Sequence, residues 1–208
     1  MGTVGPRRAE EAAMRVIYPY VTSFPEAVAA LPPAAERIHL AAWDVEAYWR
    51  LLREAWRSGE DFMVVEQDMV LPAGAVWSFE RCPREWCGLP YFMHETWGCW
   101  HGTVRYRGSL TKRLPNLPDE IKARHWESLD SAWINHLRLA GYNEAHWHWP
   151  PARHMSTRSP ERPSHMKCPA CGTDIRPTIG QEIAALTDDG PFAPYRATLR
   201  LTMTADVL

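Results

Sequence analysis

The chain has 208 residues, 46% of them hydrophobic and 11% aromatic, which is enough for a sizeable core and excludes a chain disordered throughout. It carries 23 Lys and Arg against 25 Asp and Glu, a formal net charge of -2 with no basic stripe, so nucleic acid is not the expected partner. No apolar stretch approaches the roughly 20 residues that span a bilayer, and the first residues lack the apolar middle of a signal peptide. We therefore expect a soluble, cytoplasmic protein without a membrane span.

Strands and helices alternate in the first third of the chain. β-branched, aromatic and apolar runs predict strands at residues 15–21, 37–43 and 61–66. Ala-rich or helically spaced segments predict helices at residues 26–35 and 45–57. This order predicts an α/β fold with a mixed, mostly parallel sheet flanked by helices, rather than a sandwich.

The later segments add helices, strands and a change of composition. A helix at residues 75–80, strands and loops at 86–107, a helix from Asp119, a helix from Ser128 to Gly141 and a strand at 144–149 are predicted. The domain organisation follows from composition: a flexible leader at 1–13, one domain at 14–154, a Ser, Arg and Pro-rich linker at 155–164 and a C-terminal extension at 165–208. The extension predicts a helix at 181–186 and a strand at 195–204.

Glu66 and Asp68 directly follow the third predicted strand. Carboxylates at positions i and i+2 of an extended segment point the same way, and parallel sheets bind ligands beyond the carboxyl ends of their strands. The pair is therefore placed to hold one hard cation, which in turn could hold a diphosphate. The alternative is a solvated acidic turn.

The order of the elements resembles GT-A-fold nucleotide-sugar glycosyltransferases over residues 15–154. The first strand, Val16–Tyr20, is followed by Glu66–Asp68 where those enzymes have an Asp-x-Asp motif, then by the helix Asp130–Tyr142 and by Pro150–His154. More closely, the chain resembles small glycosyltransferase-like proteins encoded by bacteriophages of actinobacteria. That closer resemblance rests on Tyr48-Trp49, Trp56, Val65–Asp68, Cys82–Cys87, Trp126 and Leu129-Asp130.

This resemblance implies a divalent metal at the acidic motif. Asp68 is the expected principal ligand of Mn²⁺ or Mg²⁺, Glu66 is expected on the metal, a metal-bound water or the donor ribose, and His154 is expected to complete the shell. His146 and His148, which share one face of their strand, compete with His154 for that role. The donor nucleotide is expected near Tyr20 and Asp44.

For two acidic residues, Asp130 and Asp44, a structural role is the alternative to a functional one. Asp130 is the candidate general base, which would deprotonate an acceptor hydroxyl in a reaction that inverts the anomeric centre. Capping of its helix is the equally weighted alternative. Asp44 likewise has N-capping of the helix at 45–57 as its alternative to nucleotide binding.

Eleven tryptophans are a heavy aromatic load for 208 residues, and sugar CH faces stack on aromatic rings. Trp97, Trp100 and Trp126 are expected to flank the acceptor region. The helical positions of three others predict core packing instead, for Trp49, Trp56 and Trp133.

Cys168-Pro-Ala-Cys171 followed by Gly172 has the spacing of a zinc knuckle. Cys82 and Cys87 are expected to supply the other two ligands, with His165 as a competing third ligand. A reduced pair of thiols without metal is the alternative.

The sequence thus predicts a metal-dependent glycosyltransferase that moves a sugar from a nucleotide diphosphate to a hydroxyl of a glycan, protein or small molecule. Its expected cofactors are Mn²⁺ or Mg²⁺, with a structural Zn²⁺ in the extension. Two other interpretations stay open: a non-catalytic protein that binds glycan or nucleotide sugar on a degenerate transferase fold, and a zinc-stabilised structural or interaction protein.

Overall fold

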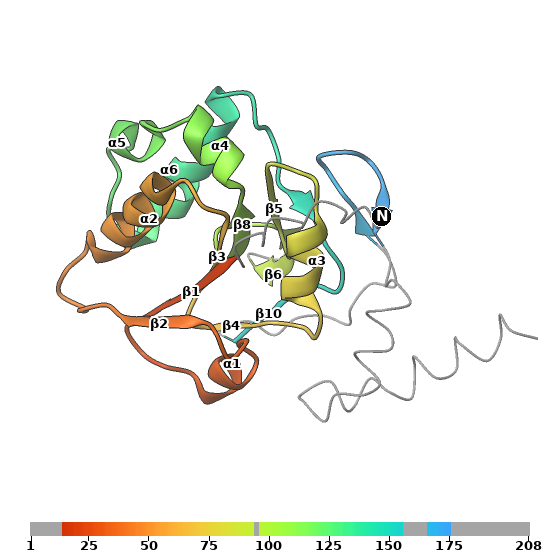
Figure 1. Cartoon of the computed structure of the whole chain (residues 1–208). Helices are drawn as coiled ribbons and strands as arrows, with labels where there is room; N and C mark the ends of the chain where they lie inside the picture. Colours follow the sequence, from red (N-terminus) through yellow and green to blue (C-terminus); the bar gives the residue numbers. More distant parts are fainter. Residues whose placement is uncertain (1–13, 94–95, 156–165, 176–208) are drawn as a thin grey trace, which may run out of the picture.

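A six-stranded sheet forms the centre of the computed structural model, which describes residues 14–93, 96–155 and 166–175 (Figure 1). The strands, in spatial order, are β2 (Glu36–His39), β1 (Arg15–Tyr20), β3 (Phe62–Val65), β8 (Thr103–Tyr106), β5 (Trp86–Gly88) and β9 (His146–Trp147). The predicted leader, the predicted linker beyond residue 155, His165, and the helix at 181–186 and strand at 195–204 lie outside the described residues.

All strands of this sheet except β8 run in one direction. β1 is parallel to β2 and β3, β5 is parallel to β9, and β8 is antiparallel to both of its neighbours. The carboxyl ends of five strands and the amino end of β8 therefore lie at the same end of the sheet, which is called its carboxyl-terminal edge below. The predicted mixed α/β class with a mostly parallel sheet is confirmed.

Helices cover both faces of the sheet (Figure 1). One face carries α2 (Ala47–Ser58), α4 (Gly108–Arg113), α5 (Leu117–Glu120) and α6 (Trp126–Leu139), and the other carries α1 (Pro25–Ala29) and α3 (Ala75–Arg81). Alternate strand residues supply the two cores, as the pleat requires: Phe62 and Val64 face the first set of helices, and Met63 and Val65 face the second.

The amphipathic helices behave as their spacing predicts. Trp49 and Trp56 of α2 and Trp133 of α6 are 6%, 1% and 0% exposed, which confirms their assignment to the core. α2 ends at Gly59, whose φ of 70° is the left-handed conformation that glycine adopts without a steric penalty. The end of α6 beside Gly141 is confirmed as well.

Three predicted helix starts are wrong, and one of them is that of α5, which begins at Leu117 rather than Asp119. α2 begins at Ala47, and the side chain of Asp44 pairs with Arg50 instead of capping the helix. α6 begins at Trp126, two residues earlier than predicted, because His125 caps it, with its Nδ1 accepting a hydrogen bond from the Glu127 amide at 3.3 Å. Asp130 therefore lies in the second turn of α6, so its carboxylate is not a cap and needs another explanation.

Three two-stranded ladders complete the fold. They pair β4 (Met69–Val70) with β10 (Arg153–His154), β6 (Tyr91–Met93) with β7 (Thr96–Gly98), and β11 (Met166–Lys167) with β12 (Asp174–Ile175). β4 and β10 are only two residues each and were not predicted. No helix within the described ranges is long and apolar enough to cross a membrane.

Candidate functional site

Asp68 and His154 meet at the carboxyl-terminal edge of the sheet. β4 and β10 pair antiparallel with His154 opposite Met69, and the Met155 amide donates to the Asp68 carbonyl at 2.9 Å. This register brings His154 Nε2 to 3.2 Å from Asp68 Oδ2, with the two side chains 11% and 23% exposed. Residues separated by most of the domain thus form one partly accessible pair, as the resemblance implied.

Glu66 lies beside this pair, one residue beyond β3. Its backbone is fixed by the Glu66 amide, which donates to the Gly102 carbonyl at 2.8 Å, and its Oε1 accepts a hydrogen bond from the Tyr48 hydroxyl at 2.9 Å. Burial raises the pKa of the Glu66 carboxyl well above its usual value, and the charges of Asp130 and Asp68 raise it further, against the opposing effect of Tyr48. Glu66 is thus a half-buried acid next to two other acids.

Asp130 lies on α6, which covers the sheet face that also carries α2, and its charge acts on Glu66. Its Oδ1 is buried and has no hydrogen-bond partner among the described residues. Burial, and then the charge of Asp68, raise the pKa of Asp130 to about 7. A carboxyl group with this pKa exchanges a proton near neutral pH, which a general base requires.

The three carboxylates, Glu66, Asp68 and Asp130, are named here the carboxylate cluster. Within the described residues, neither Glu66 nor Asp130 forms a salt bridge, and Asp68 is paired only with a histidine. Ligand atoms of Glu66, Asp130 and His101 all lie within 4.8 Å of one another. Carboxyl groups held this close raise one another's pKa, and a bound cation would favour their ionised forms, so the cluster has the composition of a site completed by a positive ion.

His101 is the member of this region that the sequence analysis missed. It is fully buried just before β8, and burial lowers its pKa to about 3, so the ring is neutral. Its Nε2 lies 2.7 Å from the Tyr106 hydroxyl and its Nδ1 lies 3.3 Å from the Tyr48 hydroxyl. No motif marks His101; only the reversed direction of β8 brings it to this edge.

The hydrogen bonds of His101 have a defined direction. The Tyr48 hydroxyl has one proton and donates it to Glu66, so it can only accept from His101, whose Nδ1 must carry the proton. His101 Nε2 then accepts from Tyr106. The chain Tyr106, His101, Tyr48 is named here the relay, and it ends on the Glu66 carboxylate.

Gln67 of the acidic motif has partners outside the carboxylate cluster. The same holds for Tyr20 and Asp44, the two residues expected near the nucleotide. Gln67 Oε1 accepts from the Val21 and Thr22 amides at 2.7 and 3.0 Å, so Gln67 ties the loop after β1 to the loop after β3. Tyr20 packs against Tyr18 and His39. With Asp44 paired to Arg50, the contacts of Tyr20 and Asp44 lie along β1, β2 and α2 rather than in the carboxylate cluster.

The tryptophans expected at the acceptor divide into two groups. Trp126 is 55% exposed and lies four residues before Asp130 on α6, so the two side chains share one helix face. Trp97 packs against the β11–β12 hairpin, and Trp100 packs on Tyr91 with ring centroids 5.1 Å apart. Of the three tryptophans, Trp126 is the one that lies on the same face of α6 as Asp130, the candidate base.

The cysteines gather at the far edge of the sheet, around β9. His146, Cys168 and Cys171 form one group whose ligand atoms all lie within 4.8 Å, and Cys82, His146 and His148 form another. Hydrogen bonds with Cys87 and His148 lower the pKa of the Cys82 thiol to about 3, against the effect of burial. The four cysteines predicted to share one metal therefore do not form one group among the described residues.

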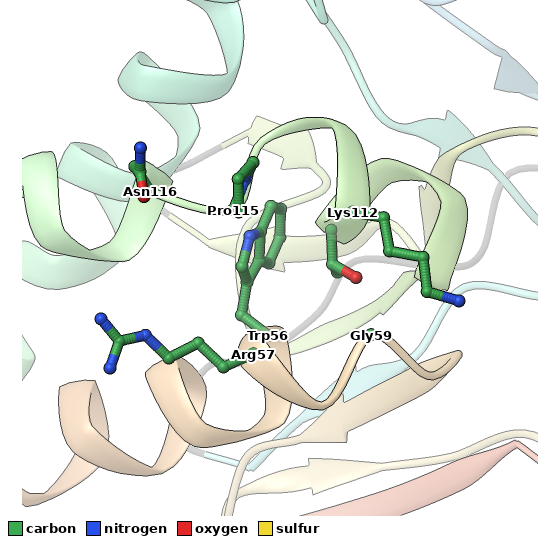
Figure 2. A pocket seen from close by; sticks show the side chains of 7 residues that line it. Trp56, Arg57, Gly59, Lys112, Pro115 and Asn116 are labelled. Atoms are coloured by element: carbon green, nitrogen blue, oxygen red, sulfur yellow. The ribbon is translucent and has the colours of Figure 1, made fainter.

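A pocket of about 350 Å³ lies at the other end of the molecule. Figure 2 shows Trp56 beside Pro115, with Arg57 and Lys112 extending in opposite directions. Gly59, which also lines the pocket, precedes β3, whereas Glu66 follows it. The pocket includes none of the residues predicted for the metal or the donor, so it is separate from the carboxylate cluster.

Comparison with protein-family models, with curated proteins and with solved structures gave no match for this chain.

Proposed function

We propose that this protein is a metal-dependent glycosyltransferase that uses a nucleotide-diphosphate sugar. The observation that carries the proposal is the carboxylate cluster with His154, which gathers three acids and one imidazole at the ligand-binding edge of a mostly parallel sheet. The GT-A resemblance had implied Asp68, His154, Glu66 and Asp130 on sequence grounds alone. Their convergence supports that assignment.

The donor atoms fit a hard divalent ion. Two neighbouring ligands of an octahedral ion with bonds of about 2.1 Å are separated by roughly 3 Å, and Asp68 Oδ2 and His154 Nε2 are 3.2 Å apart. Carboxylate oxygen suits Mg²⁺ and Mn²⁺, and an imidazole favours Mn²⁺ of the two. When bound, the ion supplies positive charge for the diphosphate leaving group.

Asp130 has the properties of the base in this reaction. Its pKa of about 7 allows it to be ionised and still basic at neutral pH. Its buried Oδ1 has an unused acceptor position, which can take the proton of an acceptor hydroxyl. Trp126, exposed on the same face of α6, offers a ring on which a sugar of donor or acceptor can stack.

The proposal is tested by thermal denaturation of the full chain with a panel of nucleotide diphosphates and their sugars. A ligand that binds only the folded state raises the melting temperature. We expect at least one nucleotide sugar to raise it only when Mn²⁺ is present, and to be slowly hydrolysed under those conditions. Mn²⁺-independent binding of glycan alone would replace the proposal with a non-catalytic glycan-binding protein.

A second test uses the relay. Tyr48→Phe removes the donor to Glu66 and leaves His101 Nδ1 without its acceptor, so we expect the Mn²⁺ dissociation constant to rise roughly 10- to 100-fold, as for other groups that orient metal ligands. Tyr106→Phe is the matched control, because it removes a hydroxyl at the far end of the relay, three hydrogen bonds from Glu66. Isothermal titration with Mn²⁺ should give the smaller change for Tyr106→Phe; equal affinities in all three proteins would exclude Glu66 from the metal site.

A further inference from the structure

We infer that His146, Cys168 and Cys171 bind a Zn²⁺ ion, which fastens the C-terminal hairpin to the edge strand β9. This site is independent of the proposed transfer reaction. It differs from the four-cysteine site that the spacing suggested, because an imidazole from the central sheet takes the place of Cys82 and Cys87.

The hairpin itself has the backbone of a metal knuckle. After β11, the Cys171 and Gly172 amides both donate to the Cys168 carbonyl, at 3.3 and 2.7 Å, and the Cys168 amide donates to the Thr173 carbonyl at 3.0 Å. Gly172 has φ of 70°, which allows the tight turn before β12. The two sulfur atoms of this turn lie within 4.8 Å of each other and of a ring nitrogen of His146.

The distances among the three side chains match those around one tetrahedral zinc ion. With Zn–S of about 2.3 Å and Zn–N of about 2.0 Å, a sulfur and a nitrogen bound to the same ion are about 3.5 Å apart. His146 Nδ1 lies 3.2 Å from Cys168 Sγ and 3.6 Å from Cys171 Sγ. The ring nitrogen is therefore at the spacing of a third ligand, without rearrangement of the sheet.

Neighbouring groups hold both sulfur atoms in place. Cys168 is completely buried, and its Sγ accepts a hydrogen bond from the Trp147 amide at 3.3 Å. Cys171 Sγ lies 3.3 Å from the Thr173 hydroxyl. Trp147 also packs against the hairpin, so the strand that carries the histidine supplies both a ligand and a contact to the buried sulfur, as groups that support zinc ligands do.

The competing group of Cys82, His146 and His148 is the poorer zinc site. It offers one sulfur instead of two, and Cys82 already interacts with Cys87 and His148. Zinc favours thiolate ligands. We therefore assign the ion to the group that includes the knuckle, and assign its fourth position to a nitrogen or oxygen donor, since the other described cysteines fall outside that group.

The metal would close a loop that contains His154. Cys168 and Cys171 are 22 and 25 residues from His146 in the sequence, and β10 lies between them. Such a cross-link restricts the unfolded chain and holds the ends of the segment that brings His154 to Asp68. Loss of zinc should therefore lower the melting temperature.

X-ray absorption at the zinc edge of the full chain, purified under reducing conditions, tests the assignment. We expect about one zinc per chain, with two sulfur ligands near 2.3 Å and two nitrogen or oxygen ligands near 2.0 Å. Four sulfur ligands would replace it with the four-cysteine site, and one sulfur with the group around Cys82. A chain that holds no zinc after purification and takes up none on titration would also overturn it.

Substitutions give an independent measurement. Cys171→Ser and His146→Asn should each weaken zinc binding at least 100-fold in competition with a chromogenic chelator, whereas Cys82→Ser and Cys99→Ser should change it less than twofold. Loss of zinc in Cys82→Ser with retention in Cys171→Ser would refute the site. Asp68→Asn should keep its zinc, so this result does not depend on the transferase proposal.

Discussion

Asp130→Asn is expected to abolish most sugar transfer and, at the same time, to stabilise the protein above neutral pH. Loss of a general base typically costs 10²- to 10⁴-fold in rate. The stabilisation arises because the ionised carboxylate is buried near Asp68 without a hydrogen-bond partner on Oδ1. Asparagine keeps the size of the side chain and removes the charge.

The pH dependence of this effect follows from the raised pKa. The Asp130 carboxyl has its ordinary pKa of 3.8 in the unfolded chain and about 7 in the folded one, so the folded state binds its proton more tightly. Its protonation therefore favours folding fully below pH 3.8, and this benefit is lost as the pH rises through about 7. With these two pKa values, linkage gives Asp130→Asn an advantage of about 4 kcal/mol at pH 8, which should nearly disappear at pH 4.

Urea denaturation of both proteins at several pH values, without added Mn²⁺, measures this difference. Glu127→Gln is the matched control, since Glu127 lies on the same helix with its side chain 68% exposed; its stability should stay within about 0.5 kcal/mol of wild type. Transfer by the wild-type protein should rise with pH and level off above about pH 7. A variant with lower stability than wild type at pH 8 would contradict the buried, uncompensated charge.

The pattern of strands and helices predicted the sheet and the carboxylates, because apolar runs and helical spacing are local properties of the chain. The family resemblance, rather than the pattern, suggested that Asp68 and His154 share one site. The physical connection between them is the β4–β10 ladder, and strands of two residues have no periodicity to detect. The partners of Asp68 could be suggested by the sequence, but the register that brings them to 3.2 Å could not be derived from it.

His101 and His146 show a different limit. Both owe their places to the strand order: β8 runs against its neighbours and β9 forms the edge next to β5. The alternation of His146 and His148 with tryptophans correctly placed the two rings on one face, with centroids 5.1 Å apart. Which cysteines that face would meet depends on long-range packing, which a pattern along one strand does not contain.

Asp44 illustrates how a local rule can be overridden. The residue before a helix is often an acidic cap, and Asp44 has the right position and chemistry. In the structure a turn separates it from the helix, with the Ala47 amide donating to the Asp44 carbonyl at 3.0 Å, and its carboxylate pairs with Arg50. The salt bridge therefore takes the place of the cap that the local pattern predicted.

Asp68→Asn is expected to reduce Mn²⁺ affinity by at least 100-fold, because it removes the charged oxygen paired with His154 and leaves an amide that binds divalent ions poorly. Asp44→Asn is the matched control. Asp44 is an acidic residue that follows β2, and its charge is already paired with Arg50. Titration of Mn²⁺ alone, followed by the electron paramagnetic resonance of the free ion, should show wild-type affinity for Asp44→Asn.

The same substitution should also change Asp130, since the charge of Asp68 is one of the causes of its raised pKa. In the Asp68→Asn background the pKa of Asp130 should fall, and the stabilisation by Asp130→Asn at pH 8 should become smaller than in wild type. A double-mutant cycle in urea measures this coupling directly. Independent, additive effects of the two substitutions would mean that the carboxylates do not interact, and the proposed metal site would lose its electrostatic basis.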